Sequence, residues 1–396
     1  MLTENGIDKL ISPVVRRQQN INRYVLQVIA ERIKEVGGVL PSDLYTIRKL
    51  IKSGEDIRKI NKYLAYQTRL QVKDIKQIIS KVAQDSYKDA KLFYIKRGAP
   101  YVPFEENAVL QNVIRMTAIQ TAETYENLAK AQAFMIRDLR NPAVLKPTPI
   151  AKTYQSVLDE AIQAAQSGVV DYNSAMRRTI EQLNDSGIQY VTYNTESGKR
   201  YHQRLDTAVR RNLLDGIRQM NQRAQDIIGE QFGADGIELT AHENPAPDHA
   251  PVQGRQFTLE EFNKMQSGDD FVDVNGKHYA GFDRAIGTLN CMHLAYKIII
   301  GVSAPVYSDA ELDAINKRNE QGYTFESGKH ITMYDCTQYQ RRMETDIRRL
   351  KDAEQMAKEA GNKDLAAKYH TKLSSRIRVY YTFSKNCGLK PKLNRI

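Results

Sequence analysis

Hydrophobic residues recur at helical spacing through the first third of the chain. The first series lies between Ser12-Pro13 and Gly37-Gly38, and it consists of Val15, Ile21, Val25, Val28, Ile29 and Ile33. Serine followed by proline is typical of a helix start and a glycine pair of a helix end, so one helix is expected between them. Shorter series within 44–51, 57–64 and 72–82, and a longer one near 105–138, predict further helices. Residues 1–140 are therefore predicted to form a helical N-terminal arm.

A proline-rich stretch separates this region from a different pattern. The prolines between Asn141 and Pro149 disfavour helix and favour extended backbone, so this stretch is predicted to be a linker. Beyond it, helical series lie near 151–166, 171–184 and 205–230. Strand-like runs lie between and after them, at 188–193, 236–240, 271–279 and 294–300. We therefore expect an α+β domain over residues 150–325, with a small and mainly antiparallel sheet.

Local signals support this central domain. Thr258 with Glu261, and Ser308 with Glu311, match the capping box that starts a helix. Asn275-Gly276 is a strong signal for a hairpin turn. These signals predict one short helix after Thr258, another after Ser308, and a pair of strands on either side of Asn275-Gly276.

Residues 329–396 return to a helical pattern. Tyr339, Met343, Ile347 and Leu350 share one apolar face, and Gly361-Asn362 then interrupts the series before a second helix. A helical hairpin is expected. The predicted fold class is therefore α+β and mostly helical, with N-terminal helices and a C-terminal helical hairpin on either side of the central domain.

The net charge of +11 is distributed unevenly. Residues 1–100 carry 20 Lys and Arg against 10 Asp and Glu, and residues 329–396 carry 16 against 7. The intervening residues, 101–328, carry 22 against 30, so two basic ends flank an acidic middle. This asymmetry indicates a polyanion or an acidic protein surface as partner, although solvated basic helices can have the same composition.

Four arginines of the C-terminal segment recur seven residues apart. They are Arg341, Arg342, Arg348 and Arg349. Nearly two helical turns separate the two pairs by about 10 Å, a spacing that can reach phosphates along one backbone. The stripe predicts sequence-independent binding to double-stranded DNA. The alternative is that these arginines pair with Glu344 and Asp346, or with the acidic middle of the chain.

Several protein classes are excluded or disfavoured by the sequence. No run of about 18 apolar residues is present, so no membrane-spanning helix is expected. The cysteines Cys291, Cys336 and Cys387 are few and widely spaced, which indicates a reducing compartment rather than a disulfide framework. The Gly-x-Ser-x-Gly, phosphate-loop and Cys-x-x-Cys motifs are all missing, so the chain is not expected to be an enzyme.

One cluster carries metal-ligating residue types. His242 and His249 lie in one short segment, and Cys291 and His293 lie in another. Three imidazoles and a thiolate could form a tetrahedral zinc site. The alternatives are that these side chains only satisfy hydrogen bonds in the core, or that a cysteine and a histidine form a catalytic pair. A metal-dependent hydrolase or nuclease using the four residues is the second functional hypothesis.

The same two segments carry a family resemblance. His242, Asp248-His249-Ala250 and Gln253-Gly254 are followed by Asn290-Cys291-Met292-His293. This arrangement resembles the phage minor capsid protein 2 family, which is related to Mu-type head morphogenesis proteins. The resemblance spans roughly residues 10–395 and is tightest over 154–355. It departs from the family at Ala246-Pro247, where Arg-Pro is usual, and at Met292, where Arg is usual.

The resemblance implies a low-copy structural component of the virion head of a phage or prophage. Its implied partners are the portal protein, capsid or scaffold proteins and genomic DNA. Its implied task is to aid head assembly and DNA packaging or delivery, after synthesis in the cytoplasm of the bacterial host. A host nucleic-acid-binding protein is a third hypothesis, which would share the basic ends but leave the histidine segments unexplained.

Overall fold

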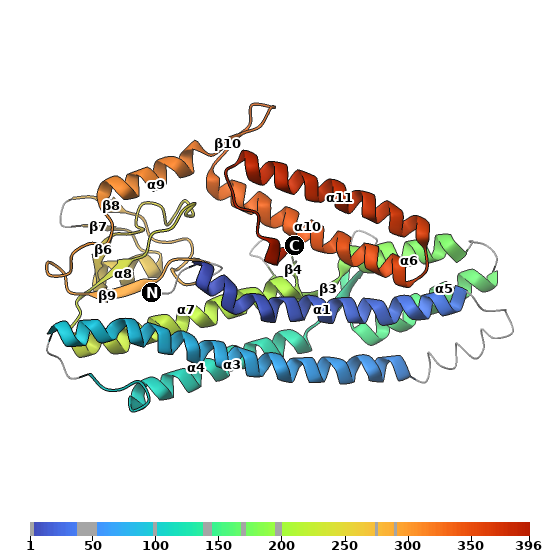
Figure 1. Cartoon of the computed structure of the whole chain (residues 1–396), viewed down its shortest axis with the longest axis horizontal. Coiled ribbons are helices and arrows are strands. Elements are labelled where there is room, and N and C mark those ends of the chain that lie inside the picture. The colour runs from blue at the N-terminus through green and yellow to red at the C-terminus, as the bar shows by residue number, and fades with distance from the viewer. Residues whose placement is uncertain are drawn as a thin grey trace.

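Long helices arranged lengthwise form most of the molecule (Figure 1). The structure is a computed structural model that describes residues 4–37, 54–97, 101–137, 145–167, 172–194, 200–273, 276–288 and 291–396. The helices of the main body are α1 (Glu4–Gly37), α3 (Glu55–Arg97), α4 (Ala108–Lys130), α5 (Ile150–Ser167), α6 (Tyr172–Ser186), α7 (Leu205–Phe232), α10 (Met333–Glu359) and α11 (Lys363–Asn386). None of the described helices is long and apolar enough to cross a membrane.

The first helix begins earlier than the sequence predicted. Helix α1 starts at Glu4, so Pro13 lies inside it rather than in its first turn. The Ser12 hydroxyl donates to the Asp8 carbonyl, four residues back, instead of capping a helix start. Ile7 and Ile11 are almost fully buried, and their packing holds the turns before the proline. Burial therefore outweighs the local signal at Ser12-Pro13.

Other predicted N-terminal boundaries also change. The series within 57–64 and 72–82 belong to one helix, α3, and the series within 44–51 lies outside the described residues. The predicted helix near 105–138 ends at Lys130, and strand β1 (Ala133–Arg137) follows it.

A four-stranded antiparallel sheet occupies part of the predicted linker. Its order is β2-β1-β3-β4, with β2 (Leu145–Thr148), β3 (Ile188–Asn194) and β4 (Arg200–Arg204). Pro147 lies in β2, an edge strand, where its missing N–H removes no bond of the sheet interior. The segment 138–144 of that linker lies outside the described residues.

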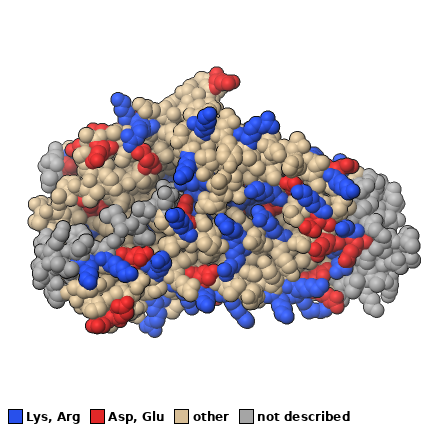
Figure 2. Space-filling model, viewed as in Figure 1, with Lys and Arg blue, Asp and Glu red and all other residues tan. Residues whose placement is uncertain are grey.

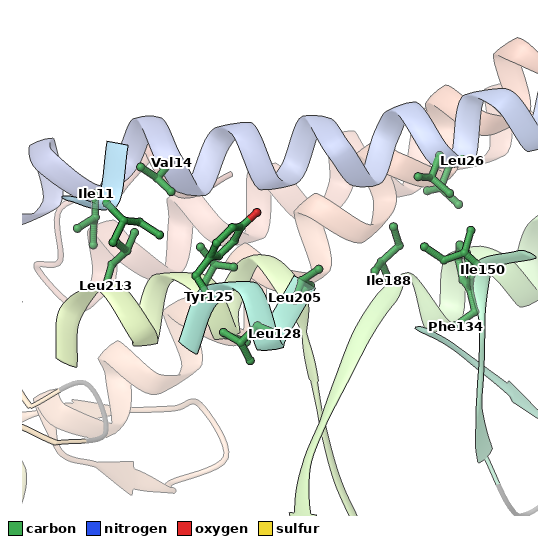
Figure 3. Close-up of a cluster of buried hydrophobic side chains, with 14 of the residues drawn as sticks. Ile11, Val14, Leu26, Tyr125, Leu128, Phe134, Ile150, Ile188, Leu205 and Leu213 are labelled. Carbon is green, nitrogen blue, oxygen red and sulfur yellow. The ribbon is translucent and has the colours of Figure 1, made fainter. Parts of the chain in front are cut away.

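A single buried cluster joins the helices of the body. Figure 3 shows Ile11 and Val14 of α1 beside Leu213 of α7 and Tyr125 of α4. The same cluster includes residues of α3, α5, α6, α10 and α11. Helices α1, α3 and α4 thus share a core with helices of the predicted central domain and with the C-terminal hairpin, which differs from the separate arm that the sequence predicted. The division of the chain at the predicted boundaries stays a prediction.

A smaller α+β unit lies at one end of the body (left in Figure 1). Its three-stranded antiparallel sheet has the order β6-β5-β9, and its own buried cluster is separate from that of the body. Its elements are β5 (Gly236–Leu239), β6 (Gln256–Thr258), α8 (Leu259–Ser267), β7 (Phe271–Val272), β8 (His278–Tyr279), β9 (Ala295–Ile298) and α9 (Asp309–Gln321).

The structure confirms the predicted fold class and several local elements. Both capping boxes are present, at the starts of α8 and α9. Strands β7 and β8 pair as the predicted hairpin, and α10 and α11 form the predicted helical hairpin. A short pair, β10 (Tyr323–Thr324) and β11 (His330–Ile331), connects α9 to α10, and a 3₁₀ turn at Leu393–Arg395 ends the chain.

Candidate functional site

The sheet of the small unit brings the two predicted site segments together. Strands β5 and β9 are antiparallel, with Leu239 opposite Ala295. The chain that leaves β5 therefore runs beside the chain that enters β9. Two further bonds extend the pairing, because the Thr240 N–H donates to the Leu294 carbonyl and the Leu294 N–H donates to the Thr240 hydroxyl. His242 and His249 follow this point, and Cys291 and His293 precede it.

Three of the four predicted residues converge on one point. The Cys291 Sγ lies 3.7 Å from the His249 Nδ1 and 3.5 Å from the His293 Nδ1. Among the described residues, these three side chains form the group of histidine, cysteine and acidic ligand atoms that all lie within 4.8 Å of one another. His249 and His293 are each 1% exposed and Cys291 is 7% exposed. The predicted packing of the two segments against each other is confirmed.

The outer nitrogen of each converging histidine faces an oxygen. The His249 Nε2 lies 2.8 Å from the Arg284 carbonyl oxygen, and the His293 Nε2 lies 3.2 Å from the Gln253 Oε1. The Gln253 Oε1 also accepts from the His242 backbone N–H at 3.1 Å, which identifies it as the amide oxygen. Both Nε2 atoms are therefore donors, and both Nδ1 lone pairs face the cysteine sulfur.

His242 lies beside this group without joining it. Its ring centroid is 4.2 Å from that of His293, and its Nδ1 lies 2.9 Å from the Glu243 carbonyl oxygen. The side chain is half-buried. Its position is thus next to the cluster of three rather than among the converging atoms.

Hydrogen bonds and charges around the cluster offset the effect of burial on the pKa of Cys291. Burial raises the pKa of the Cys291 thiol, but His249, the Gly287 backbone and Arg218 outweigh burial and lower it below its usual value. Burial likewise lowers the pKa of His249, but its contacts with Cys291, Arg284 and Asp248 raise it overall. Burial and the neighbouring positive groups hold the pKa of His293 well below its usual value, so that ring is neutral.

Gln253 and Gly254 are site residues that were not among the ligands predicted from the sequence. The Gln253 Nε2 donates to the Asn316 side chain on α9 at 3.3 Å, so this glutamine connects α9 to His293. Gly254 has φ +69°, and a Cβ there would lie 2.3 Å from a methyl carbon of Leu312. The Gln-Gly pair therefore allows α9 to approach closely, and its place in the family motif was the available signal.

Comparison with known protein families identifies the family of this chain. The family model described as phage minor capsid protein 2 matches residues 2–380. The chain belongs to this family. Searches of curated proteins and of solved structures found no match. The family supports a structural role in the phage virion and contact with other virion proteins.

In this family member, Met292 stands where the motif usually has arginine. An arginine from elsewhere reaches the same place, because the Arg218 Nη2 of α7 lies 3.1 Å from the Met292 Sδ. Arg218 is 3% exposed, so a buried guanidinium group lies against the segment that carries Cys291. A helix of the main body thus places a positive charge beside Met292.

The predicted arginine stripe on α10 is only partly at the surface. Arg341 and Arg342 are exposed and Arg349 is half-buried. Arg348 is buried, forms an ion pair with Asp206 at 3.0 Å and donates to the Arg395 carbonyl oxygen. Arg348 therefore pairs with a residue of the middle segment, as the alternative predicted, while DNA binding by Arg341, Arg342 and Arg349 stays a prediction.

Helix α11 carries basic residues that were not among the DNA-binding residues predicted from the sequence. From Leu365 to Ile396 the chain has eight Lys and Arg and no Asp or Glu. Four of these side chains on α11 are exposed, namely Lys368, Lys372, Arg378 and Lys385. The signal was the absence of acidic residues over this stretch. Charge was counted over residues 329–396 as a whole, and this count did not separate out the stretch without acidic residues.

Proposed function

We propose that this protein is a low-copy component of the virion head that binds at the portal and contacts genomic DNA. In this role it aids head assembly and DNA packaging or delivery. One observation supports the DNA contact. The two basic ends of the chain, which are far apart in sequence, pack against each other.

Polar contacts hold the two ends together. The Asn22 amide of α1 donates to Asp352 of α10 at 2.8 Å. Near the C-terminus, Arg395 forms an ion pair with Asp8 at 2.7 Å, and the Asn394 amide donates to the Ser12 hydroxyl at 2.8 Å. Helices α1 and α10, one from each basic end, therefore lie side by side. Figure 2 shows Lys and Arg side chains spread across the middle of one face of the molecule.

A charge-removal variant tests the DNA contact. Replacing Lys368, Lys372, Arg378 and Lys385 with glutamine is expected to weaken binding to double-stranded DNA of any sequence. Each phosphate contact contributes roughly 0.9 to the slope of log affinity against log salt, so loss of four contacts lowers the slope by about 3 to 4. Fluorescence anisotropy with two unrelated duplexes across a salt series measures the slope.

The matched control removes the same number of charges from the small α+β unit. Its exposed residues Lys264, Lys277, Lys317 and Arg318 are replaced with glutamine. This control is expected to keep the wild-type slope. Equal slopes for wild type and the α11 variant would reject the DNA contact on α11, and equal losses in both variants would indicate a general effect of net charge.

Portal association is supported by exposed apolar residues within residues 1–140. Val109 is 63% exposed and Met116 is 53% exposed, and their spacing of seven places both on one side of α4. Single exposed apolar residues are common, whereas two on one helix face suit a protein contact. We expect V109D/M116D to lose co-purification with the portal protein of the same phage.

A control variant of similar exposure distinguishes a contact from a general effect of acidic substitution. Val302 and Val306, each 63% exposed, lie in the small unit, and V302D/V306D is expected to retain portal binding. Retention of portal binding by V109D/M116D would exclude α4 as the docking surface.

The alternative of a metal-dependent hydrolase or nuclease is less well supported by the geometry. A catalytic metal keeps a position open to substrate. The three converging side chains are at most 7% exposed, and the nearest carboxylate, Asp248, pairs with Arg284 at 3.0 Å. Burial of this kind favours a structural role for the cluster.

A further inference from the structure

The cluster of His249, Cys291 and His293 has more acceptors than donors. Each imidazole donates through its Nε2 to an oxygen, so each presents an Nδ1 lone pair to the Cys291 sulfur. A thiol has one hydrogen and can satisfy only one of the two lone pairs. A hydrogen-bonded core therefore leaves one buried acceptor facing a sulfur that has no second proton to donate. A cation bound among the three atoms would satisfy all of them.

Two of the three ligand separations agree with tetrahedral coordination. Metal–ligand lengths of about 2.0–2.1 Å for nitrogen and 2.3 Å for sulfur place two such ligands roughly 3.5 Å apart. The two nitrogen–sulfur separations here are 3.7 and 3.5 Å, and all three ligand atoms lie within 4.8 Å of one another. The sulfur therefore already lies at a metal-site distance from both nitrogens.

The surroundings also match those of metal-bound histidines. Such histidines usually donate their second ring nitrogen to a carbonyl or carboxylate, which fixes the tautomer and the ring orientation. The Arg284 carbonyl does this for His249, and the Gln253 amide oxygen does it for His293. Gln253 is held in turn by the His242 N–H and by Asn316.

We propose that His249, Cys291 and His293 bind one zinc ion through Nδ1, Sγ and Nδ1. Two imidazoles and a thiolate suit zinc rather than calcium or magnesium, which prefer oxygen ligands. The ion joins the segment after β5 to the segment before β9, and through Gln253 it stabilises the contact with α9. This proposal is independent of the DNA and portal contacts, because none of the residues tested for them is a ligand.

The first test measures metal in the full-length protein. Protein purified without chelator is expected to contain about one zinc per chain by mass spectrometry, as a single site requires. Cys291→Ser is expected to lose most of this zinc. Cys336→Ser and Cys387→Ser are matched controls, because both cysteines are buried in a different cluster and should leave the zinc content unchanged.

A spectroscopic test covers the case in which Cys291→Ser fails to fold. Wild-type protein stripped of metal and reloaded with Co²⁺ should show the strong visible bands of a tetrahedral site and a near-ultraviolet thiolate-to-metal band. Gln253→Ala is expected to fold and to weaken Co²⁺ binding by roughly 10- to 100-fold, the usual effect of removing an outer-shell partner. Wild-type protein that is free of zinc, gains no such spectrum with Co²⁺ and melts at the same temperature with and without added zinc would overturn the proposal.

Discussion

Deleting residues 2–37 is expected to unfold the helical body. The deletion removes all of α1, whose buried apolar side chains are Ile7, Ile11, Val14, Ile21, Val25, Leu26, Ile29, Ala30 and Ile33. Burial of one large aliphatic side chain contributes roughly 1.5–3 kcal/mol. For the eight large aliphatic side chains the total is about 12–24 kcal/mol, as large as or larger than the net stability of about 5–15 kcal/mol that is usual for a folded protein. Circular dichroism should therefore show reduced helicity and no cooperative thermal transition.

A control variant keeps α1 but changes its outer surface. Lys9, Arg16, Asn20 and Glu31 are exposed on the same helix, and replacing all four with alanine is expected to preserve the wild-type melting transition. A truncated protein that still melts cooperatively, with the wild-type helicity per residue, would show instead that residues 1–37 belong to a separable arm.

The elements that could be predicted from the sequence are those specified by neighbouring residues. The capping boxes that start α8 and α9 each depend on two side chains three positions apart, and both occur as predicted. The helical hairpin of α10 and α11 was likewise predictable, because apolar periodicity and the break at Gly361-Asn362 are local features. Local signals suffice where no distant contact competes with them.

The elements that could not be predicted depend on packing between distant segments. The start of α1 is set by burial of Ile7 and Ile11 and not by Ser12-Pro13. Strand β2 pairs with β1 at a sheet edge, where Pro147 is tolerated. A proline-rich stretch therefore contains a strand that propensity alone disfavours.

Only part of the candidate site could be predicted from the sequence. Residue type alone indicated His242, His249, Cys291 and His293, and pairing of β5 with β9 brings them together. The sequence could not show that Gln253 orients His293, because that contact spans 40 positions. It also could not show that Arg348 is buried. The periodicity of α10 describes neighbours on that helix, whereas the partner of Arg348 is Asp206, at the start of α7.

The last prediction concerns Asp352, whose carboxylate joins three parts of the body. Asp352 is 5% exposed and accepts from the Asn22 amide at 2.8 Å and from Arg204 at 3.0 Å, with Arg23 at 3.4 Å. It thereby connects α10 to α1 and to the junction of β4 with α7. Asp352→Ala leaves the guanidinium group of Arg204, which is 12% exposed, with Asp206 as its remaining partner in this network. Breaking a buried pair in this way costs about 3–5 kcal/mol.

Asp346→Ala is the matched control for Asp352→Ala, since it removes a carboxylate from the same helix. Asp346 pairs with Arg376 at 3.0 Å, but both side chains are substantially exposed, at 38% and 41%. Exposed pairs contribute about 0–1 kcal/mol, so this variant should unfold at nearly the wild-type urea concentration. Urea denaturation followed by circular dichroism compares the two. A loss of stability as small in Asp352→Ala as in Asp346→Ala would mean that the contacts among α1, α10 and Arg204 contribute little, and that apolar burial alone holds the two basic ends together.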